Sequence, residues 1–415
     1  MSDSQPVRQI LNSLLDRFEQ PGRQRVVRVR LDPREHQEYF TEREILPRRT
    51  TNAALQELAQ QGILQLHWAR WEEGNWLTAV DLLPGGAEVL YARLGRKPRG
   101  ERELVLQRLL TAQTPRRPWH AAFLEWAKGQ LAAHRSVAPL SLDDPRTSAD
   151  LLRALDALAQ LNAPILQRTL SVRLFADSKR LEEFKSALVG VLRRFDPDAA
   201  TYGEDDWAML NAHQLMRVPE YVPLAGPLRL QVQGASLDLA PFVPSVALSA
   251  TTLRAALVGN CSAHVLVTVE NATSFNELVT AAPPGRFLML YTGGFASPSV
   301  VAFLQTVRAA CPELAFYHWG DLDVGGLRIL AHLRKQLGRV APLAMDVSTF
   351  EVFRTQGQAL SAAERSSLLQ LRSVPLLADC SDLIDCLLTA GLKLEQEAVD
   401  PQVVIAVLGV RESNL

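Results

Sequence analysis

The spacing of apolar residues gives the first part of the chain a helical and then a hairpin pattern. Over residues 7–20 apolar positions recur every three or four residues, which predicts an amphipathic helix. A second helix is expected over Ala53–Gln61, where Gly62 would end it. Two alternating segments joined by Glu72–Asn75 then predict a β-hairpin. A helix followed by a hairpin is the outline of a winged-helix unit, although other small α+β modules share it.

The middle of the chain changes from helical to β-rich. Helices are predicted over 119–134 and 148–162, and another amphipathic helix begins near Ser178. Between residues 205 and 250, five prolines oppose long helices, and the segment LRLQVQ alternates as a strand does.

From Val265 onward, short and continuously apolar runs alternate with helical patterns. The runs are VLVTV, FLMLY, LAFYHW and VAPLAM. Strands that are apolar on both faces and alternate with helices indicate a parallel sheet covered on both sides.

These patterns predict a multidomain protein of mixed α+β and α/β class. Residues 1–118 are expected to form a helical, winged-helix (CAP-like) DNA-binding region and a basic connector. Residues 119–250 form a helical and β-rich middle region that could be a second part of the DNA-binding domain. Residues 251–415 form a Rossmann-like domain with a parallel sheet.

The amino-acid composition indicates the class of protein but says little about its function. Hydrophobic residues make up 47% and charged residues 21%, which is ordinary for a soluble protein. No apolar run approaches the about 18 residues of a membrane span, and the N-terminus lacks a signal-peptide core. The four cysteines have no zinc-type spacing. We therefore expect a cytoplasmic protein with no membrane partner, and the net charge of −1 restricts any nucleic-acid surface to a local patch.

Residues 93–117 contain such a local excess of positive charge. Eight basic residues there stand against only two acidic ones. The segment could follow a phosphate backbone, or it could be a solvated linker. The candidates for DNA contact are Arg96, Lys97, Arg99 and Arg102.

Carboxylates follow the predicted strands at the carboxyl edge of the sheet, where such folds bind ligands. Glu270 directly follows VLVTV, and Asp321 and Asp323 follow LAFYHW in the sequence GDLDVGG. Clustered carboxylates repel one another unless a cation holds them, and oxygen ligands suit Mg²⁺ or Mn²⁺. We therefore predict that Glu270, Asp321 and Asp323 are the catalytic, metal-binding residues of a phosphodiester-cleaving site. Asp346, after VAPLAM, could support them.

Other residues at this edge are candidates for supporting roles. Asn271 and Thr273 could orient Glu270 or contact phosphate, or they could simply form a turn. The segment SFNE at 274–277 fits a capping box that would begin the next helix. The paired glycines Gly293 and Gly294 would allow the backbone to approach a substrate closely.

The combination of motifs resembles a known family. A glutamate at one strand end and a DxD motif two strands later are similar to the Toprim domains of topoisomerases, primases and related nucleases. The segments VENATSFNEL, YTGGFAS, YHWGDLDVGGLRIL and LKLEQE resemble the nuclease subunits of Wadjet-type SMC defence systems, called JetD or MksG. The upstream segment RTLSVRLFADSKRLEEF resembles the part that precedes Toprim in that family. The resemblance covers about residues 165–400.

The resemblance implies a homodimeric, metal-dependent endonuclease that acts on double-stranded plasmid DNA. The implied partners are a condensin-like SMC ATPase, a kleisin and associated subunits. By the same resemblance, Glu395 or Glu397 of LKLEQE approaches the active site, although a solvated helix face would look the same. Lys179 and Arg180 are candidates for DNA contact or ordinary exposed helix charges.

Three other functions fit part of the pattern. The A subunit of topoisomerase VI shares the architecture and cleaves through a tyrosine. However, Tyr39, Tyr91 and Tyr202 lack the helix-start position and arginine pair of that site, so we favour hydrolysis. A non-catalytic DNA-binding adaptor would use the acidic residues structurally. A haloacid-dehalogenase phosphatase places DxD on its first strand and would leave Glu270 unused.

Overall fold

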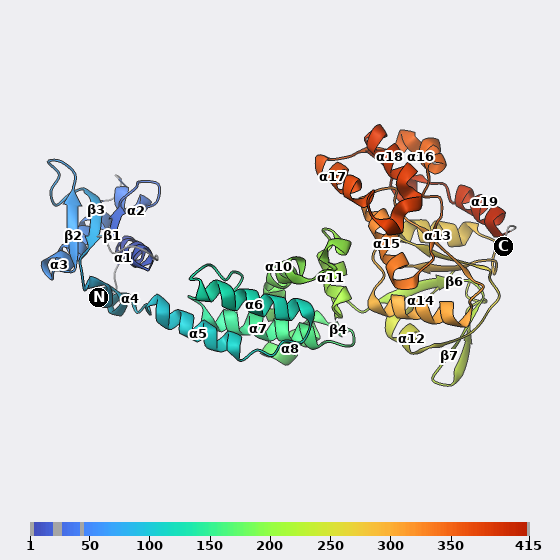
Figure 1. Ribbon diagram of the computed structural model, residues 1–415, viewed down its shortest axis with the longest axis horizontal. Coiled ribbons are helices and arrows are strands. Elements are labelled where there is room, and N and C mark those ends of the chain that lie inside the picture. Colours follow the sequence, from blue (N-terminus) through green and yellow to red (C-terminus); the bar gives the residue numbers. More distant parts are fainter. Residues whose placement is uncertain (1–3, 20–26, 42–44, 413–415) are drawn as a thin grey trace. The chain divides into compact units, whose positions relative to one another are not determined.

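The computed structural model describes residues 4–19, 27–41 and 45–412. The chain divides into two compact units, each of which mixes helices with strands as the sequence predicts (Figure 1). Unit 1 consists of Met1–Thr114 and Leu124–Leu152, and unit 2 of Pro115–Phe123 and Arg153–Leu415.

Unit 1 begins with a small α/β module. Its elements are α1 (Gln5–Phe18), β1 (Val27–Arg30), α2 (Gln37–Phe40), α3 (Ile45–Gln60), β2 (Leu64–Trp68) and β3 (Leu77–Leu82). The strands form an antiparallel sheet in the order β1-β3-β2. The apolar face of α1 lies in the core beneath this sheet. The predicted first helix and hairpin are confirmed, whereas α3 is longer than expected and β1 is marked in the sequence by only two valines.

The basic segment 93–117 is mostly helical, and most of its side chains are exposed or half-buried. It contains the end of α4 (Gly86–Leu94) and all of α5 (Arg99–Thr111). The predicted helices that follow are confirmed as α6 (Pro118–Ala132) and α7 (Pro145–Gln160), and the division between the units passes through both.

Unit 2 contains a mixed sheet of six strands. Their order is β14-β13-β11-β12-β6-β9, and β11 pairs in parallel with both β12 and β13. The strands are β6 (Tyr221–Ala225), β9 (Val246–Ser249), β11 (Val265–Val269), β12 (Leu288–Tyr291), β13 (Ala315–Trp319) and β14 (Ala341–Pro342). The division predicted at residue 250 falls inside this sheet, because β6 is hydrogen-bonded to β12. The run VAPLAM contributes only the two residues of β14, since Pro342 has no N–H to extend the ladder.

Helices cover both faces of this sheet. Helices α14 (Pro298–Ala310) and α15 (Val324–Leu337) pack together, and α13 (Ala272–Ala281) packs with α19 (Pro401–Glu412) (Figure 1). Right-handed crossovers from β11 to β12 and from β12 to β13 run in opposite directions, which places α13 and α14 on opposite faces. The buried strand β11 therefore lies at the centre of the core, and the carboxyl ends of β11, β12 and β13 meet at one edge.

Unit 2 contains further elements besides this sheet and the helices that cover it. Near its N-terminus lie β4 (Ile165–Leu166), α8 (Gln167–Phe175), α9 (Arg180–Glu183), α10 (Lys185–Phe195), α11 (Asp206–Ala212) and β5 (Leu215–Met216). A second sheet, β10-β7-β8, contains β7 (Leu228–Val232), β8 (Ala235–Asp238) and β10 (Leu257–Cys261), with α12 (Ala250–Ala255) before β10. The C-terminal part contains α16 (Val347–Phe353), β15 (Gln358–Ala359), α17 (Ala362–Leu371), α18 (Ser381–Ala390) and β16 (Leu392–Lys393).

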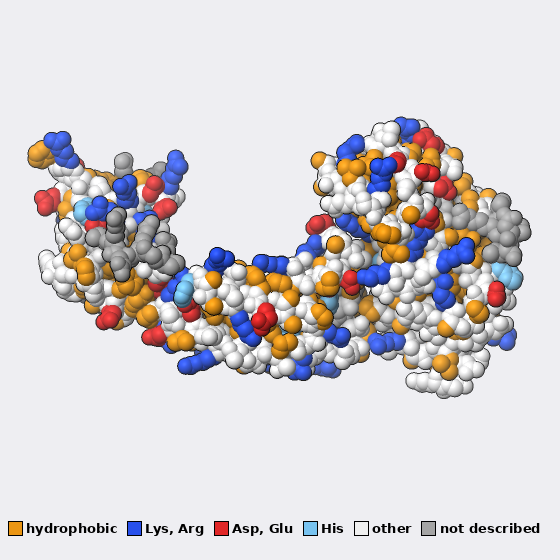
Figure 2. Space-filling view, in the orientation of Figure 1, with side chains coloured by type: hydrophobic (Ala, Val, Ile, Leu, Met, Phe, Trp, Pro, Cys, Tyr) orange, Lys and Arg blue, Asp and Glu red, His pale blue; other side chains and the backbone are white. Residues whose placement is uncertain are grey.

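Two features bear on possible partners. Over the described residues, the structure contains no helix that is long and apolar enough to span a bilayer. Figure 2 shows Lys and Arg side chains dispersed among acidic and apolar ones on the face that it draws. Contacts to a polyanion would therefore depend on particular side chains rather than on overall charge.

Candidate metal centre

Two of the predicted carboxylates meet at the carboxyl edge of the parallel strands. Glu270 follows β11, and its backbone N–H donates to the carbonyl of Trp319 at the end of β13 (3.1 Å). Asp321 lies two residues beyond Trp319, and its backbone N–H donates to Oε2 of Glu270 (3.2 Å). The parallel pairing of β11 with β13 therefore brings Glu270 and Asp321 together across 51 residues of sequence.

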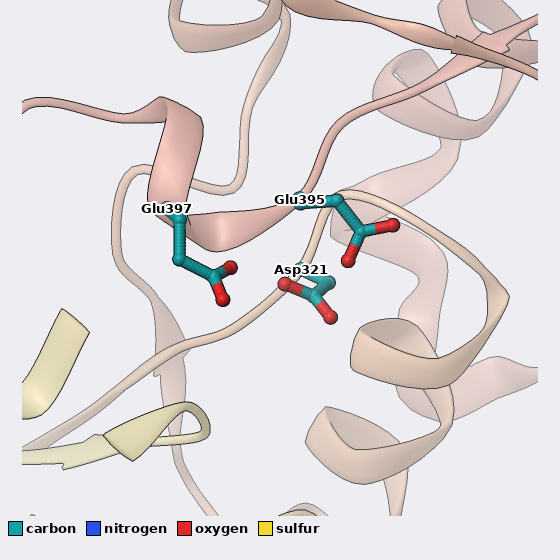
Figure 3. A group of neighbouring side chains, drawn as sticks. All are labelled: Asp321, Glu395 and Glu397. Atoms are coloured by element: carbon teal, nitrogen blue, oxygen red, sulfur yellow. The ribbon is translucent and has the colours of Figure 1, made fainter. Parts of the chain in front are cut away.

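A distant segment completes the site. Leu394 pairs with Leu322 through two backbone hydrogen bonds (2.8 and 3.2 Å), which holds the segment after β16 against the loop after β13. Asp321, Glu395 and Glu397 each present one carboxylate oxygen, and these oxygens lie within 4.8 Å of one another. Figure 3 shows the two glutamates extending from one segment toward the aspartate on another. We refer to Asp321, Glu395 and Glu397 as the acid cluster.

Burial and mutual repulsion disfavour negative charge at this edge. Burial raises the pKa of Glu270 to about 8, and the charge of Asp321 contributes to the rise. Burial also raises the pKa of Asp321 to about 7, against a hydrogen bond from Gln396 and with further repulsion from Asp323 and Glu395. A divalent cation would relieve this repulsion. Three carboxylate oxygens at this spacing are the hard donors that Mg²⁺ and Mn²⁺ prefer, so the residues fit such an ion.

Asp323 is placed differently from the prediction. It is the N-cap of α15, and its Oδ1 accepts a hydrogen bond from the backbone N–H of Gly326 (2.9 Å). It contributes to the electrostatics of Asp321 but is not one of the three residues of the acid cluster. Glycine is required at position 326, because a Cβ there would lie 2.1 Å from the carbonyl oxygen of Asp321.

Asn271 connects helix α13 to the acid cluster. Its Oδ1 accepts from the backbone N–H of Thr273 (2.8 Å), and its Nδ2 donates to Oε1 of Glu397 (2.6 Å). The predicted capping box at 274–277 is wrong, since α13 begins at Ala272 and Ser274 is buried within its first turn. The side chain of Thr273 is exposed, so its backbone rather than its hydroxyl takes part.

The other supporting candidates are two glycines after β12 and an aspartate after β14. Gly293 and Gly294 follow β12 with φ of +64° and +85°, a conformation that favours glycine. Asp346 is the N-cap of α16 and accepts from the backbone N–H of Thr349 (2.8 Å). A helix-capping role accounts for Asp346 in this structure.

Two residues of this segment were not predicted from the sequence. Gln396 lies between Glu395 and Glu397, and Lys393 lies near Glu395. Gln396 is fully buried and is hydrogen-bonded to three residues, Asn271 after β11 and Trp319 and Asp321 at the end of β13. Lys393 Nζ lies 3.1 Å from Glu364 and 3.6 Å from Glu395. The signal was present in LKLEQE, where a buried amide stands between two acids, but it is visible only once the segment is known to lie against β13.

His318 is a core residue. It is fully buried in β13, and burial lowers its pKa to about 3. Its Nδ1 lies 3.0 Å from Oγ1 of Thr268 on the neighbouring strand. The imidazole is therefore neutral and contributes to packing.

The arginines predicted to contact DNA are paired with acids. Arg96 and Arg102 both bind Glu19 (2.7 and 2.6 Å), and Arg99 binds Glu103 (2.7 Å). Arg180 likewise pairs with Glu183 (2.6 Å). These guanidinium groups have structural partners, whereas the lysines of the predicted set are exposed, namely Lys97 and Lys179.

Unit 2 is thus an α/β protein core in which the carboxyl ends of parallel strands meet at a half-buried acidic site. Residues 227–408 match a family model described as Wadjet protein JetD, C-terminal. The chain is also 24% identical over 368 residues to the Wadjet protein JetD of Bacillus cereus (strain Q1), covering 87% of this chain and 88% of that protein. Together the two matches support this protein as a Wadjet JetD family member, as its motifs predict.

Proposed function

We propose that this protein is a metal-dependent DNA endonuclease, the nuclease subunit of a Wadjet-type, condensin-like plasmid-defence system. The observation that carries the proposal is the acid cluster, which gathers beside Glu270 at the carboxyl edge of parallel strands. In open α/β folds this edge is where ligands bind. In this proposal residues 251–415 provide a Toprim catalytic domain, and β6 and β9 extend its sheet.

The chain's own residues have distinct parts in the proposed reaction. Asp321, Glu395 and Glu397 would hold Mg²⁺ or Mn²⁺, with Glu270 and Asp323 as further metal-binding candidates. When bound, such an ion neutralises phosphate charge and makes a coordinated water more acidic. Glu270 lies against the backbone of Asp321, where its carboxylate can orient that water or accept its proton. The side-chain amide of Asn271 donates a hydrogen bond to Glu397 and so helps to orient its carboxylate.

Hydrolysis fits the surroundings of the tyrosines better than a covalent tyrosine intermediate does. Tyr39 is fully buried, with its hydroxyl donating to Asn52 (2.9 Å) and accepting from the backbone of Leu77 (2.8 Å). Tyr91 donates to Glu19 (2.8 Å), and Tyr202 packs against Phe295. All three candidates are at most 8% exposed, so none presents its hydroxyl to a DNA strand.

The proposed substrate is double-stranded plasmid DNA. In unit 1 the order α1-β1-α2-α3-β2-β3, with the sheet β1-β3-β2, fits a winged-helix module that would bind the duplex. Lys97 and Lys179 are exposed cations suited to phosphate contacts. Cleavage of both antiparallel strands needs two sites, so we propose a homodimer that acts in the cytoplasm with an SMC ATPase, a kleisin and associated subunits.

A cleavage assay tests the proposal. Supercoiled plasmid is incubated with the purified protein and Mn²⁺ or Mg²⁺, with EDTA and an Asp321→Ala, Asp323→Ala double variant as controls. The products are examined with and without proteinase. Nicked or linear DNA with free ends, dependent on metal and on the aspartates, is the expected result. DNA ends linked to protein would instead indicate a transesterase. Metal-independent binding without cleavage, in the presence of the ATPase partner, would indicate an adaptor.

A further inference from the structure

Gln396 is a buried polar residue in the middle of the acidic site. Its side chain is 0% exposed, although it lies between two acidic neighbours that face the cluster. Its Oε1 accepts from the backbone N–H of Asn271 (2.9 Å), and its Nε2 donates to the carbonyl of Trp319 (2.9 Å). Both polar ends of the amide are therefore hydrogen-bonded inside the protein.

The partners of Gln396 are the residues beside the predicted ligands. Asn271 directly follows Glu270, and Trp319 lies two residues before Asp321. The backbone N–H of Gln396 also donates to Oδ1 of Asp321 (2.6 Å). One residue thus connects the end of β11, the end of β13 and a carboxylate of the acid cluster.

These contacts fix the position of both glutamates. Glu395 and Glu397 are the chain neighbours of Gln396, so anchoring its amide in the core sets where their backbones lie. Leu394, paired with Leu322, anchors the segment one residue earlier. Without the amide contacts, repulsion between Asp321 and the glutamates would favour movement of the segment away from the sheet edge.

We propose that Gln396 is a positioning residue for the metal centre, holding Glu395 and Glu397 at Asp321 by binding the backbone at both strand ends. The inference rests on the proposed function, because it concerns the same site. Buried hydrogen bonds behind a ligand set its orientation, and their loss commonly weakens metal affinity by about 10- to 100-fold.

Metal affinity of the full chain tests the inference separately from nuclease activity. Gln396→Met keeps the length of the side chain but cannot bind the Asn271 N–H or the Trp319 carbonyl. Mn²⁺ binding is measured by calorimetry and by the spectrum of bound Mn²⁺, at a temperature where circular dichroism shows each protein to be folded. We expect the dissociation constant for Mn²⁺ to rise by about 10- to 100-fold.

A matched control separates positioning from general destabilisation. Leu383→Ala removes a buried side chain from α18 and lowers the melting temperature, yet should leave Mn²⁺ affinity at the wild-type value. If the methionine variant does not fold, Gln396→Asn retains a polar amide that is one methylene too short to reach both partners, and the same loss of affinity is expected.

The outcomes distinguish the two proposals. Wild-type affinity in a folded Gln396 variant overturns the inference and leaves the proposed function intact. An equal loss of affinity in Leu383→Ala also overturns it, because the effect would then be general. A wild-type chain that does not bind Mn²⁺ overturns both the proposed function and the inference.

Discussion

The two units hold their buried acids in opposite ways. In unit 1 the side chain of Glu19 is 8% exposed and is bound by Arg96 and Arg102. Burial alone would raise the pKa of Glu19, but the hydrogen bonds from Arg102 and Tyr91 and the arginine charges leave it lowered. In unit 2 the pKa of Glu270 rises to about 8 and that of Asp321 to about 7, because burial is combined with neighbouring negative charge.

This difference separates a structural charge network from a candidate functional one. Opposite charges around Glu19 satisfy one another and need nothing further. The acid cluster keeps like charges together at a cost in stability, which is typical of sites that bind a cation or carry out chemistry. The arginines of segment 93–117 that were predicted to contact DNA belong to the first kind of network, because Arg96, Arg99 and Arg102 are paired with acids. The basic composition of this segment is therefore a weak guide to DNA binding.

The largest expected effect is loss of cleavage on changing the acid cluster. Asp321→Asn keeps the acceptor for the Gln396 N–H but removes the charge. We expect the rate of plasmid cleavage to fall by about 1,000-fold, equivalent to about 4 kcal/mol of transition-state stabilisation. Asp205→Asn is the control, since asparagine caps α11 as well as aspartate does. Equal rates for wild type and the Asp321 variant would remove the acid cluster from the reaction.

The next effect concerns stability in unit 1. Glu19→Gln removes the anion that Arg96 and Arg102 share and leaves each arginine one exposed acid. We expect the free energy of unfolding of this unit to fall by about 2–3 kcal/mol. Urea denaturation of the intact chain measures it. For comparison, Glu125→Gln breaks an exposed pair with Lys128 and should cost less than about 0.5 kcal/mol. Similar small losses in both variants would contradict the structural interpretation of the Glu19 network.

The pH dependence of the metal-free protein should show the repulsion directly. Burial raises the pKa of Glu270 from its ordinary value of 4.5 to about 8 in the folded protein. Its carboxyl group therefore stabilises the fold fully below pH 4.5, and this contribution is lost as the pH rises toward 8. In EDTA the melting temperature of unit 2 should therefore fall between about pH 5 and pH 8. Glu270→Gln should lessen that fall and stabilise the protein above pH 8 by on the order of 2 kcal/mol. Superimposable pH profiles for the two proteins would contradict this account.

The smallest effects come from two glycines. A Cβ at Gly320 would lie 2.6 Å from Oε2 of Glu270 and 2.8 Å from Nε2 of the fully buried His318. Gly320→Ala should therefore displace Glu270 and slow cleavage about tenfold, equivalent to about 1.4 kcal/mol. Gly190→Ala, in the middle of α10 with no atom near its Cβ, should stabilise the protein by about 1 kcal/mol and leave cleavage unchanged. Equal cleavage rates in both variants would argue against close packing around Glu270.

The sequence predicted the parallel strands because β11, β12 and β13 are buried on both faces and so appear as continuous apolar runs. It could not predict that β6 joins the same sheet, since pairing between distant strands leaves no periodic signal. The strand predicted from VAPLAM is longer than β14, because Pro342 has no N–H to extend the hydrogen bonding between the strands.

At the candidate site, the useful signal was that each carboxylate closely follows a predicted strand. Glu270 and Asp321 could be predicted to meet because both follow parallel strands. The contribution of Glu395 and Glu397 depends on a return of the chain that pairs Leu394 with Leu322, so the residues alone suggested it only by family resemblance. The capping role of Asp323 follows from the position of Gly326, whose backbone N–H donates to one of the carboxylate oxygens.

Anomalous diffraction from crystals of the full chain grown with Mn²⁺ would locate the bound ion. We predict a manganese peak bounded by the carboxylates of Asp321, Glu395 and Glu397, absent from crystals of Asp321→Asn grown under the same conditions. A peak located elsewhere, or no peak at the acid cluster at saturating Mn²⁺, would contradict the account.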